Sequence, residues 1–229
     1  MSKILTQKAF IFLGAPGAGK GTFSQIFVQK FGWVQLSTGD LCRKHIAQGT
    51  DLGKQIDFAI KSGRLVDDAV IIDMVSQWID EHINMAQGII FDGFPRTLVQ
   101  AHLFLELIQK RFSELVVNVI QFEIPDSIII ERLSARRTCS NKHCQAIYSL
   151  LKQSTQQAQR NGICDKCGSI LMQREDDKSE TIAARLQIYH QHAQPLLDFY
   201  KNHNFIIHRI NAQDSLQIVQ KELEMIAGI

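Results

Sequence analysis

GAPGAGKGT, residues 14–22, is the stretch that decides the fold, and it directly follows the apolar run Ala9 to Leu13. A buried strand that enters a glycine-dense turn and then a helix directs a row of backbone N–H groups at one spot, where an anion is favoured. The four glycines let the backbone wrap around a phosphate without obstruction by Cβ atoms, and Lys20 adds a positive charge. The alternative is a flexible loop without a ligand, which would not require four glycines and a lysine at this spacing. The sequence therefore predicts a protein that binds a nucleoside phosphate.

The rest of the chain alternates short apolar runs with amphipathic segments, which indicates a parallel sheet covered by helices on both faces. Five runs are predicted to be strands: Ala9 to Leu13, Val34 to Leu36, Gly88 to Phe91, Val116 to Phe122 and Asn204 to Ile210. Four segments have helical spacing: Gly21 to Phe31, Asp67 to Ile83, Thr97 to Lys110 and Ser179 to His203. The predicted fold class is α/β, with a single core over residues 1–229.

Two segments interrupt this alternation. Residues 37–66, the first insertion, hold short helical pieces separated by glycines at positions 49, 53 and 63. Residues 136–173, the second insertion, hold four of the five cysteines and no convincing helix. Both are expected at the loop edge of the sheet, where functional residues concentrate.

The composition limits the classes of function. A chain of 229 residues, 45% of them hydrophobic, is long enough for one large domain with insertions. A net charge of +2 argues against generic binding of polyanions such as nucleic acid. No stretch has the length of a membrane span, and the N-terminus lacks the features of a signal peptide. These features predict a cytoplasmic protein without a membrane partner. Its cysteines are then expected to bind a metal and not to form disulfides.

Two further motifs, STGD at residues 37–40 and DGFPR at residues 92–96, follow predicted strands as the glycine-rich loop does. Together the three motifs make the chain resemble an adenylate kinase of the nucleoside monophosphate kinase family, of the type with a long zinc-bearing lid. The resemblance covers nearly the whole chain. One departure is that Gly21 follows the lysine, so that the hydroxyl comes one position later than in the common GxxxxGK[ST] loop, at Thr22.

The resemblance implies a three-layer P-loop fold with a five-stranded parallel sheet, in which the first insertion binds the nucleoside monophosphate and the second forms the lid. It implies a monomer that catalyses reversible, Mg²⁺-dependent transfer of the terminal phosphoryl group of ATP to AMP, giving two ADP. If both insertions close over bound nucleotides, hinges are expected near residues 135–137 and 176–178, where polar residues flank the second insertion. Asp176 and Asp177 are then expected to pair with arginines when the lid closes.

The resemblance also implies the residues around ATP. They are Gly17, Ala18, Gly19, Lys20, Gly21, Thr22, Arg132, Arg136, Ile147, Tyr148 and Gln213. Arg132 and Arg136 are four residues apart and are expected on one face of the helix that follows Pro125. Similar enzymes often carry Asp-Gly where this chain has Asn211 and Ala212, so the contact from Gln213 would come from its backbone.

The residues implied around AMP come from the other two motifs and from arginines elsewhere. They are Thr38, Arg43, Arg64, Leu65, Val66, Gly93, Phe94, Pro95, Arg96, Gln100, Arg174 and Arg185. Arg43 suits bidentate phosphate recognition, and Gln100 offers a donor and an acceptor to a base edge. Thr38 could instead be a plain helix cap and Gln100 an ordinary surface residue. The Phe94–Pro95 bond is expected to be cis, as in similar enzymes.

A convergent set of cations is predicted to do the catalytic work: Lys20, Arg96, Arg136, Arg174 and Arg185. The nucleophile would be a phosphate oxygen of AMP, which is already largely anionic near neutral pH, so no side-chain base and none of the eight histidines is needed. Asp92 ends a buried strand, where a carboxylate needs a partner. A Mg²⁺ bound through water would supply one; a structural contact with Arg96 or with loop N–H groups is the alternative.

The cysteines of the second insertion have the spacing of a zinc site. Cys164 and Cys167 enclose two residues, as in a tight zinc knuckle, whereas Cys139 and Cys144 enclose four. Adenylate kinases with a zinc-bearing lid usually have two residues in each pair and sixteen between the pairs, while this chain has nineteen. Four thiolates are the preferred ligand set, His143 is a conceivable substitute for Cys144, and unmetallated thiols are the alternative. Such a zinc would be structural, and Cys42 would be a packing residue.

Three other functions compete with this one. A related kinase could use GTP or another nucleoside monophosphate, because base choice depends on few hydrogen bonds. A nucleic-acid-binding zinc ribbon would need a basic surface interleaved with aromatic residues, whereas the second insertion has mixed charges and Tyr148 as its only aromatic residue. An ATPase switch would not need the set of Thr38, Arg43 and Gln100.

Overall fold

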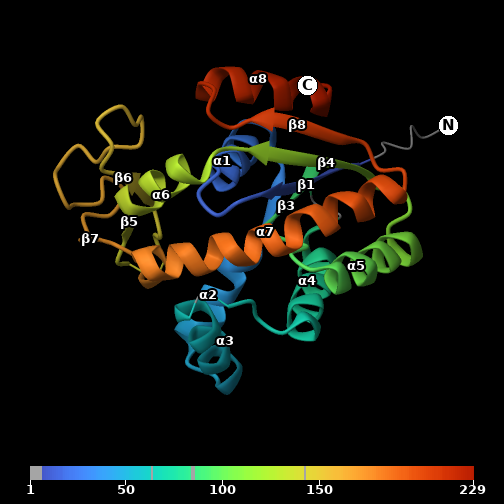
Figure 1. The fold of residues 1–229 in the computed structure, drawn as a ribbon, viewed down its shortest axis with the longest axis horizontal. Helices are drawn as coiled ribbons and strands as arrows, with labels where there is room; N and C mark the ends of the chain where they lie inside the picture. The colour runs from blue at the N-terminus through green and yellow to red at the C-terminus, as the bar shows by residue number, and fades with distance from the viewer. Residues whose placement is uncertain (1–6, 63, 84–85, 142) are drawn as a thin grey trace.

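A five-stranded parallel sheet in the order β2-β3-β1-β4-β8 forms the centre of the protein (Figure 1). Its strands are β1 (Lys8–Gly14), β2 (Val34–Ser37), β3 (Gly88–Asp92), β4 (Val116–Glu123) and β8 (Ile207–Asn211). This computed structural model describes residues 7–62, 64–83, 86–141 and 143–229, so Gly63 of the first insertion lies outside the described residues. The α/β class and the parallel sheet are confirmed, and of the five strands only the last begins later than predicted, at Ile207.

The sheet is the middle of three layers. Helices α1 (Lys20–Phe31) and α8 (Leu216–Ala227) pack on one face. Helices α4 (Asp68–His82), α5 (Leu98–Arg111) and α7 (Ser179–Asn202) pack on the other. Among the described residues, no helix combines the length and the apolar character needed to cross a membrane.

Strand β1 lies at the centre of the sheet, which explains why the run from Ala9 to Leu13 is apolar at every position. Its side chains alternate between the two faces: Phe10 and Phe12 belong to the core beneath α1 and α8, whereas Ala9 and Ile11 belong to the core beneath α4, α5 and α7. All four are at most 1% exposed. A strand covered on both faces carries apolar residues at every position, as in other parallel sheets.

Helix α8 was not predicted, although the sequence carries a signal for it. The Ser215 hydroxyl accepts a hydrogen bond from the Ile218 backbone N–H and caps the helix. Val219, Leu223 and Ala227 recur at helical spacing and are buried against the sheet.

The first insertion contains α2 (Thr38–Gln48) and α3 (Asp51–Lys61), as its short helical pieces predicted. The second contains a small antiparallel sheet in the order β6-β5-β7, and its described residues contain no helix. The strands of this sheet are β5 (Arg136–Cys139), β6 (Ile147–Ser149) and β7 (Leu171–Met172). In Figure 1 the first insertion projects at the bottom and the second at the left.

The predicted placement of Arg132 and Arg136 on one helix face is wrong. Helix α6 (Asp126–Ala135) ends before Arg136, whose backbone is extended with φ −65° and ψ 137°. Arg136 begins β5, because the chain there turns into the small sheet and pairs with Ser149. The two arginines consequently reach different partners.

Candidate active site

The glycine-rich loop is a tight turn between β1 and α1. Gly17 and Gly19 have φ values of +85° and +97°, in the region that favours glycine, and Gly19 is the N-cap of α1. A Cβ atom added at Gly17 would lie 2.9 Å from Cγ of Leu133. The Ala18 side chain is buried in the core beneath α1. The loop therefore has the backbone and the helix N-terminus that suit an anion.

Lys20 lies at the start of α1, and its ammonium group folds over the loop. Nζ donates to the carbonyl oxygens of Gly14 and Ala15 at 2.8 and 2.9 Å. Desolvation lowers the pKa of Lys20 to about 8; Asp92 opposes this shift, and the positive charges of Arg96, Arg185 and Arg136 add to it. Because a nearby anion would raise this pKa and stabilise the charged form, the ammonium group is suited to a phosphate.

Asp92 ends β3 beside the loop. A Cβ atom added at Gly21 would lie 3.4 Å from Oδ2 of Asp92, and the same oxygen accepts a hydrogen bond from Gln35 at 3.1 Å. Desolvation raises the pKa of Asp92, although the charges of Lys20 and Arg96 favour the carboxylate. A carboxylate oxygen facing the phosphate loop fits a hydrated Mg²⁺, which would favour the ionised form further.

The predicted cations converge on the same region. Burial, together with the neighbouring charges of Arg43 and Arg136, lowers the pKa of Arg174 to about 10. The Nε atom of Arg174 donates to the Thr138 hydroxyl at 2.9 Å. Arginines from separate segments of the chain come close enough here to lower one another's pKa, and such a convergent set of cations suits anions.

Two acidic residues, predicted to pair with arginines, hold part of this cluster in place. The buried Asp177 accepts from Nε and Nη2 of Arg136 at 2.7 and 2.5 Å, and from Nη1 of Arg185 at 3.2 Å. Arg185 also pairs with Asp176 at 3.2 Å. Asp176 and Asp177 belong to the short helix η2 (Glu175–Asp177), directly before α7. Both acids thus pair with arginines as expected, and the link of this pairing to closure of the lid stays a prediction.

A pocket opens between the first insertion and the end of β3. Seven of the predicted AMP-binding residues line it: Thr38, Arg64, Leu65, Val66, Gly93, Arg96 and Gln100. Gly39, Cys42, Ile60 and Ile71 complete the lining. Cys42 therefore borders the pocket besides packing in the core. The combination of apolar side chains with a few polar groups is typical of a small-molecule site.

Polar residues in and beside this pocket are held by the DGFPR motif. The Thr38 hydroxyl donates to the Gly93 carbonyl oxygen at 2.9 Å, and Nε of Arg96 donates to the same oxygen at 2.7 Å. Arg43 pairs with Asp40, while its own Nε is buried without a hydrogen-bond partner. The cis bond predicted between Phe94 and Pro95 is confirmed, and both residues are buried. Helix α2 is capped by Ser37, so Thr38 is not its N-cap.

Gln100 lines the pocket and is only 2% exposed, so it is not an ordinary surface residue. Its Oε1 accepts from the Arg96 backbone N–H at 2.8 Å, and its Nε2 donates to Oδ1 of Asp68 at 2.7 Å. The other oxygen of Asp68 accepts from the Thr97 hydroxyl at 3.0 Å. Asp68 was missed by the sequence analysis, because it lies 32 positions from Gln100 and no local motif links them.

The second insertion reaches the phosphate loop. Nε2 of Gln156 donates to the Thr22 hydroxyl at 3.3 Å, a contact that nothing in the sequence signalled. Arg132 donates to the Ala212 carbonyl oxygen at 3.0 Å and thus contacts the turn after β8, next to Gln213, which is exposed. The predicted ATP-binding region is therefore bordered by the second insertion, by α6 and by the turn after β8.

Ile147 and Tyr148 lie on β6 and face different surroundings. Ile147 is 44% exposed, whereas Tyr148 is buried beside the cysteines. The Tyr148 hydroxyl lies 3.5 Å from Sγ of Cys164 and accepts from the Asp165 backbone N–H at 2.8 Å. A contact between Tyr148 and ATP would consequently have to come from its backbone.

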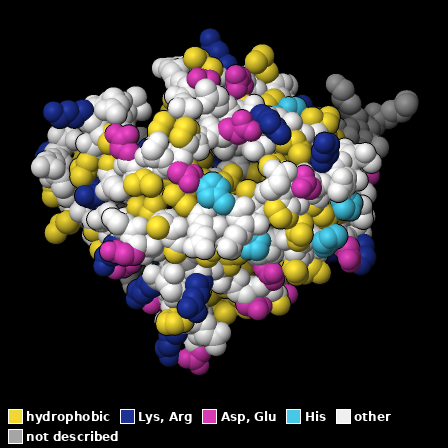
Figure 2. All heavy atoms as spheres, viewed as in Figure 1, with side chains coloured by type: hydrophobic (Ala, Val, Ile, Leu, Met, Phe, Trp, Pro, Cys, Tyr) yellow, Lys and Arg dark blue, Asp and Glu magenta, His cyan; other side chains and the backbone are white. Residues whose placement is uncertain are grey.

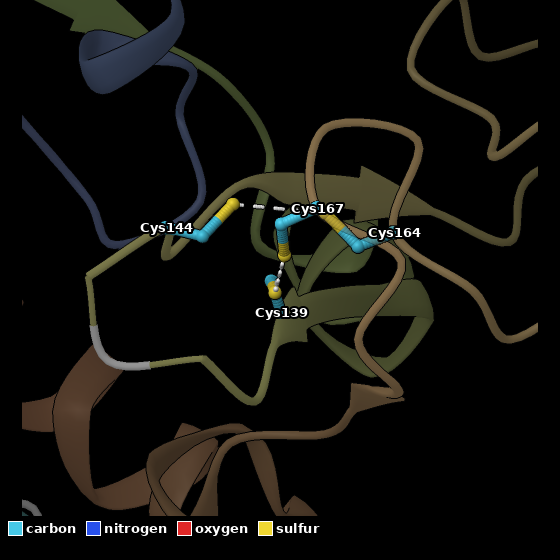
Figure 3. Close-up of side chains that lie close together, drawn as sticks. All are labelled: Cys139, Cys144, Cys164 and Cys167. Atoms are coloured by element: carbon cyan, nitrogen blue, oxygen red, sulfur yellow. Dashed lines mark hydrogen bonds between the residues drawn. The ribbon is translucent and has the colours of Figure 1, made fainter.

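The four cysteines of the second insertion form one cluster (Figure 3). Their sulfur atoms all lie within 4.8 Å of one another, and none forms a disulfide. The Sγ atoms of Cys139 and Cys167 are 3.3 Å apart, and those of Cys144 and Cys164 are 3.7 Å apart. Four sulfurs at about 2.3 Å from a tetrahedral zinc would lie about 3.8 Å from one another, so the cluster fits Zn²⁺.

The pKa values of the four thiols shift in both directions: those of Cys139 and Cys144 are raised, whereas those of Cys164 and Cys167 are lowered. The hydrogen bond from Tyr148 lowers the pKa of Cys164 to about 6, against the effect of desolvation, and the backbone N–H groups of Cys167 and Lys166 contribute. A thiolate is the form that binds zinc. The cluster contains Cys144 and not His143, as the preferred ligand set predicted.

Fold and site define a P-loop protein with a second pocket beside the phosphate loop. Comparison with known proteins makes this more specific. The model of the adenylate kinase family matches residues 12–205. The adenylate kinase of Archaeoglobus fulgidus is 39% identical over 216 residues, which cover 94% of this chain and 96% of that protein.

Other relatives agree. The adenylate kinase of Caldicellulosiruptor saccharolyticus is 37% identical over 96% of this chain and 98% of its own length. That of Thermodesulfovibrio yellowstonii is 41% identical over 83% of this chain and 85% of its own. The chain belongs to the adenylate kinase family.

Proposed function

We propose that this protein catalyses the reversible transfer of the terminal phosphoryl group of ATP to AMP, giving two ADP. The observation that carries the proposal is that the phosphate loop and the pocket of the first insertion open onto one cluster of cations. Two nucleotides whose phosphates meet there carry several negative charges, and such a cluster stabilises them at close approach.

The pocket of the first insertion would hold AMP. Leu65, Val66 and Ile71 offer apolar surface to the base, and Gln100 offers hydrogen bonds to its edge. The phosphate would lie near Arg43, whose buried Nε is a donor without a partner, and near Arg96, which lines the pocket.

ATP would lie with its phosphates on the glycine-rich loop and its base towards the turn after β8. The N–H groups of residues 17–22 and the Lys20 ammonium would bind the β- and γ-phosphates. Mg²⁺ would be held through water by Asp92 and would supply charge neutralisation on the phosphates. Arg132, Ile147 and the backbones of Tyr148 and Gln213 would surround the remainder of the nucleotide.

The residues would act by positioning and charge neutralisation. The attacking atom is a phosphate oxygen of AMP, which is largely deprotonated near neutral pH, so the transfer needs no proton to be removed by a side chain. Arg136, Arg174 and Arg185 would contact the phosphoryl group in transfer, and Asp177 keeps two of them in place. Gln156, in contact with Thr22, would help to exclude water over the loop.

Zinc would have a structural role only. Cys139, Cys144, Cys164 and Cys167 would occupy all four positions of a tetrahedral ion and leave none open for water. They would fold a lobe whose own core consists of few side chains.

An assay for ADP with and without AMP tests the proposal. We expect ADP to form from ATP only when AMP is present, with no release of inorganic phosphate. ATP hydrolysis that does not depend on AMP would favour the ATPase alternative. Initial rates with a panel of nucleoside mono- and triphosphates then separate an adenylate kinase from a kinase of other specificity.

The nucleic-acid alternative has little support in the surface. On the face shown in Figure 2, Lys and Arg side chains are interspersed with Asp and Glu and form no continuous basic patch. The monomeric state and the cytoplasmic location stay predictions. Light scattering is expected to give the mass of a single chain, 26.0 kDa.

A further inference from the structure

The groups around the Gln100 amide can form hydrogen bonds with it in only one of its two orientations. A backbone N–H can only donate and an ionised carboxylate can only accept. Gln100 lies between one such donor and one such acceptor. The Arg96 backbone N–H is 2.8 Å from Oε1, and the Asp68 carboxylate is 2.7 Å from Nε2. An amide turned by 180° would place Nε2 against the N–H group and Oε1 against the carboxylate, so both contacts would become repulsive.

Asp68 is itself fixed on both sides. It begins α4 directly after the N-cap Asp67, and its second oxygen accepts from the Thr97 hydroxyl at 3.0 Å. Thr97 in turn caps α5 by accepting from the Gln100 backbone N–H at 3.1 Å. The Asp68 carboxylate therefore joins the first turns of α4 and α5. It cannot rotate without losing its hydrogen bonds from the Thr97 hydroxyl and the Gln100 amide.

The two contacts leave Gln100 with one N–H and one lone pair for a ligand in the pocket that it lines. A 6-aminopurine presents a donor at its amino group and an acceptor at N1, which match this amide. A 6-oxopurine presents an acceptor at O6 and a donor at N1, and it would need the amide in the opposite orientation. We infer that Asp68 is a positioning residue that fixes the Gln100 amide and thereby makes the pocket select a 6-aminopurine monophosphate over a 6-oxopurine monophosphate.

This inference deepens the proposed function and rests on it. Asp68→Asn tests it, because asparagine can present N–H groups to Oε1 and so removes one of the two obstacles to the turned amide. We expect the ratio of kcat/KM for AMP to that for inosine monophosphate to fall about tenfold, the effect of one hydrogen bond to a charged group. The change is expected in KM for the two monophosphates, with kcat and the KM for ATP close to those of the unmodified protein.

Asp67→Asn is the matched control. It removes an equal charge one position away, keeps a side chain that can cap α4, and does not contact Gln100. The AMP to inosine monophosphate ratio is expected to be unchanged. If Asp68→Asn does not give a cooperative thermal transition, Asp68→Ala replaces it, with the same expectation for the ratio.

A double-mutant cycle separates positioning from a general structural effect. In a Gln100→Ala background, Asp68→Asn is expected to change the ratio by less than about twofold, because the amide through which Asp68 acts is gone. An unchanged ratio in Asp68→Asn, or an equal fall with and without Gln100, would overturn the inference. Equilibrium binding of AMP and inosine monophosphate gives the same ratio without turnover. A failure of the proposed reaction is therefore distinguishable from a failure of this inference.

Discussion

Lys20 shows how burial and charge act together on one side chain. Its ammonium group donates to two loop carbonyl oxygens and lies near Asp92, yet desolvation and the surrounding arginines lower its pKa to about 8. At neutral pH the group is still mostly protonated. Its protonation therefore lies close enough to physiological pH to be followed in the free enzyme.

We expect kcat/KM for ATP to fall as the pH rises above about 8, because the free enzyme then loses the Lys20 charge. Stability is expected to change in the opposite direction. Between pH 8 and 10.5, the ordinary pKa of a lysine, the unfolded chain binds more protons at Lys20 than the folded chain does. The Lys20 contribution to the free energy of unfolding therefore rises with pH. Rate profiles and urea unfolding over this pH range measure the two trends.

Lys20→Met is expected to lower kcat by about 10²–10³-fold, the effect of removing one donor aimed at developing charge. Lys30→Met, an exposed lysine on the same helix that pairs with Glu224, is expected to change kcat by less than about twofold. Retention of normal turnover by Lys20→Met would contradict the role proposed for the phosphate loop.

Asp177 is the acid on which two of the proposed catalytic arginines depend. Its side chain is fully buried and pairs with Arg136 and Arg185. Asp177→Asn keeps the shape and removes the charge. We expect it to lower the free energy of unfolding by about 2–3 kcal/mol and the Tm by about 4–12 °C. It should also lower kcat, since both arginines lose their anchor. A thermal melt that coincides with that of the unmodified protein would contradict this.

At the scale of elements, the phosphate loop depends on its fit against α6. Gly17→Ala would introduce a Cβ atom 2.9 Å from Cγ of the buried Leu133, in addition to the strain of a positive φ. We expect a loss of about 2–4 kcal/mol in stability and a raised KM for ATP, because the loop must shift. Denaturant unfolding and initial rates measure both effects.

Gly162→Ala is the matched control for Gly17→Ala. Gly162 also has a positive φ, +72°, but an added Cβ atom there would contact nothing within 4 Å. Only the backbone strain of about 1 kcal/mol is expected, with no change in the KM for ATP. Equal losses in the two variants would show that the contact with Leu133 is unimportant.

The small sheet β6-β5-β7 is expected to depend on a zinc ion bound by the four cysteines. Elemental analysis should find about one zinc ion per chain, and Cys164→Ser should lose it. Limited proteolysis is then expected to cut within the second insertion before the core, while Cys42→Ala keeps its zinc because Cys42 lies outside the cluster. Full resistance to proteolysis in metal-free Cys164→Ser would contradict a structural role.

At the scale of the whole molecule, the second insertion touches the phosphate loop through Gln156 and the core through Arg136 and Asp177. The site is thus assembled from the core and both insertions. A ligand that occupies both proposed nucleotide positions should connect all three.

We expect a mimic with two adenosines joined by five phosphates to bind far more tightly than ATP or AMP alone. At about 1,000 times its Kd it would raise the free energy of unfolding by about 4 kcal/mol, measurable as an increase in Tm. The increase should be largely lost in Lys20→Met. A mimic that stabilises no more than ATP at the same concentration would refute two adjoining pockets.

The parts of the site that consist of contiguous residues could be predicted from the sequence. The glycine-rich loop, STGD and DGFPR are contiguous, and the geometry of each depends on residues next to one another, so strand, turn and helix follow from the pattern. The four cysteines were also identified from spacing, because a tetrahedral ion constrains which thiols can share it. Helix α8 could have been identified from Ser215 and the apolar spacing after it.

Only the tertiary structure decided how distant segments meet. It ended α6 before Arg136, set Gln156 on the phosphate loop, and brought Asp68 of α4 to the Gln100 amide of α5. These contacts depend on the packing of helices against a common sheet and on the pairing of β5. Neither produces a periodic pattern of residues in the sequence. The residues proposed to bind phosphate are therefore apparent in the sequence. Those that orient them become apparent only once the chain is folded.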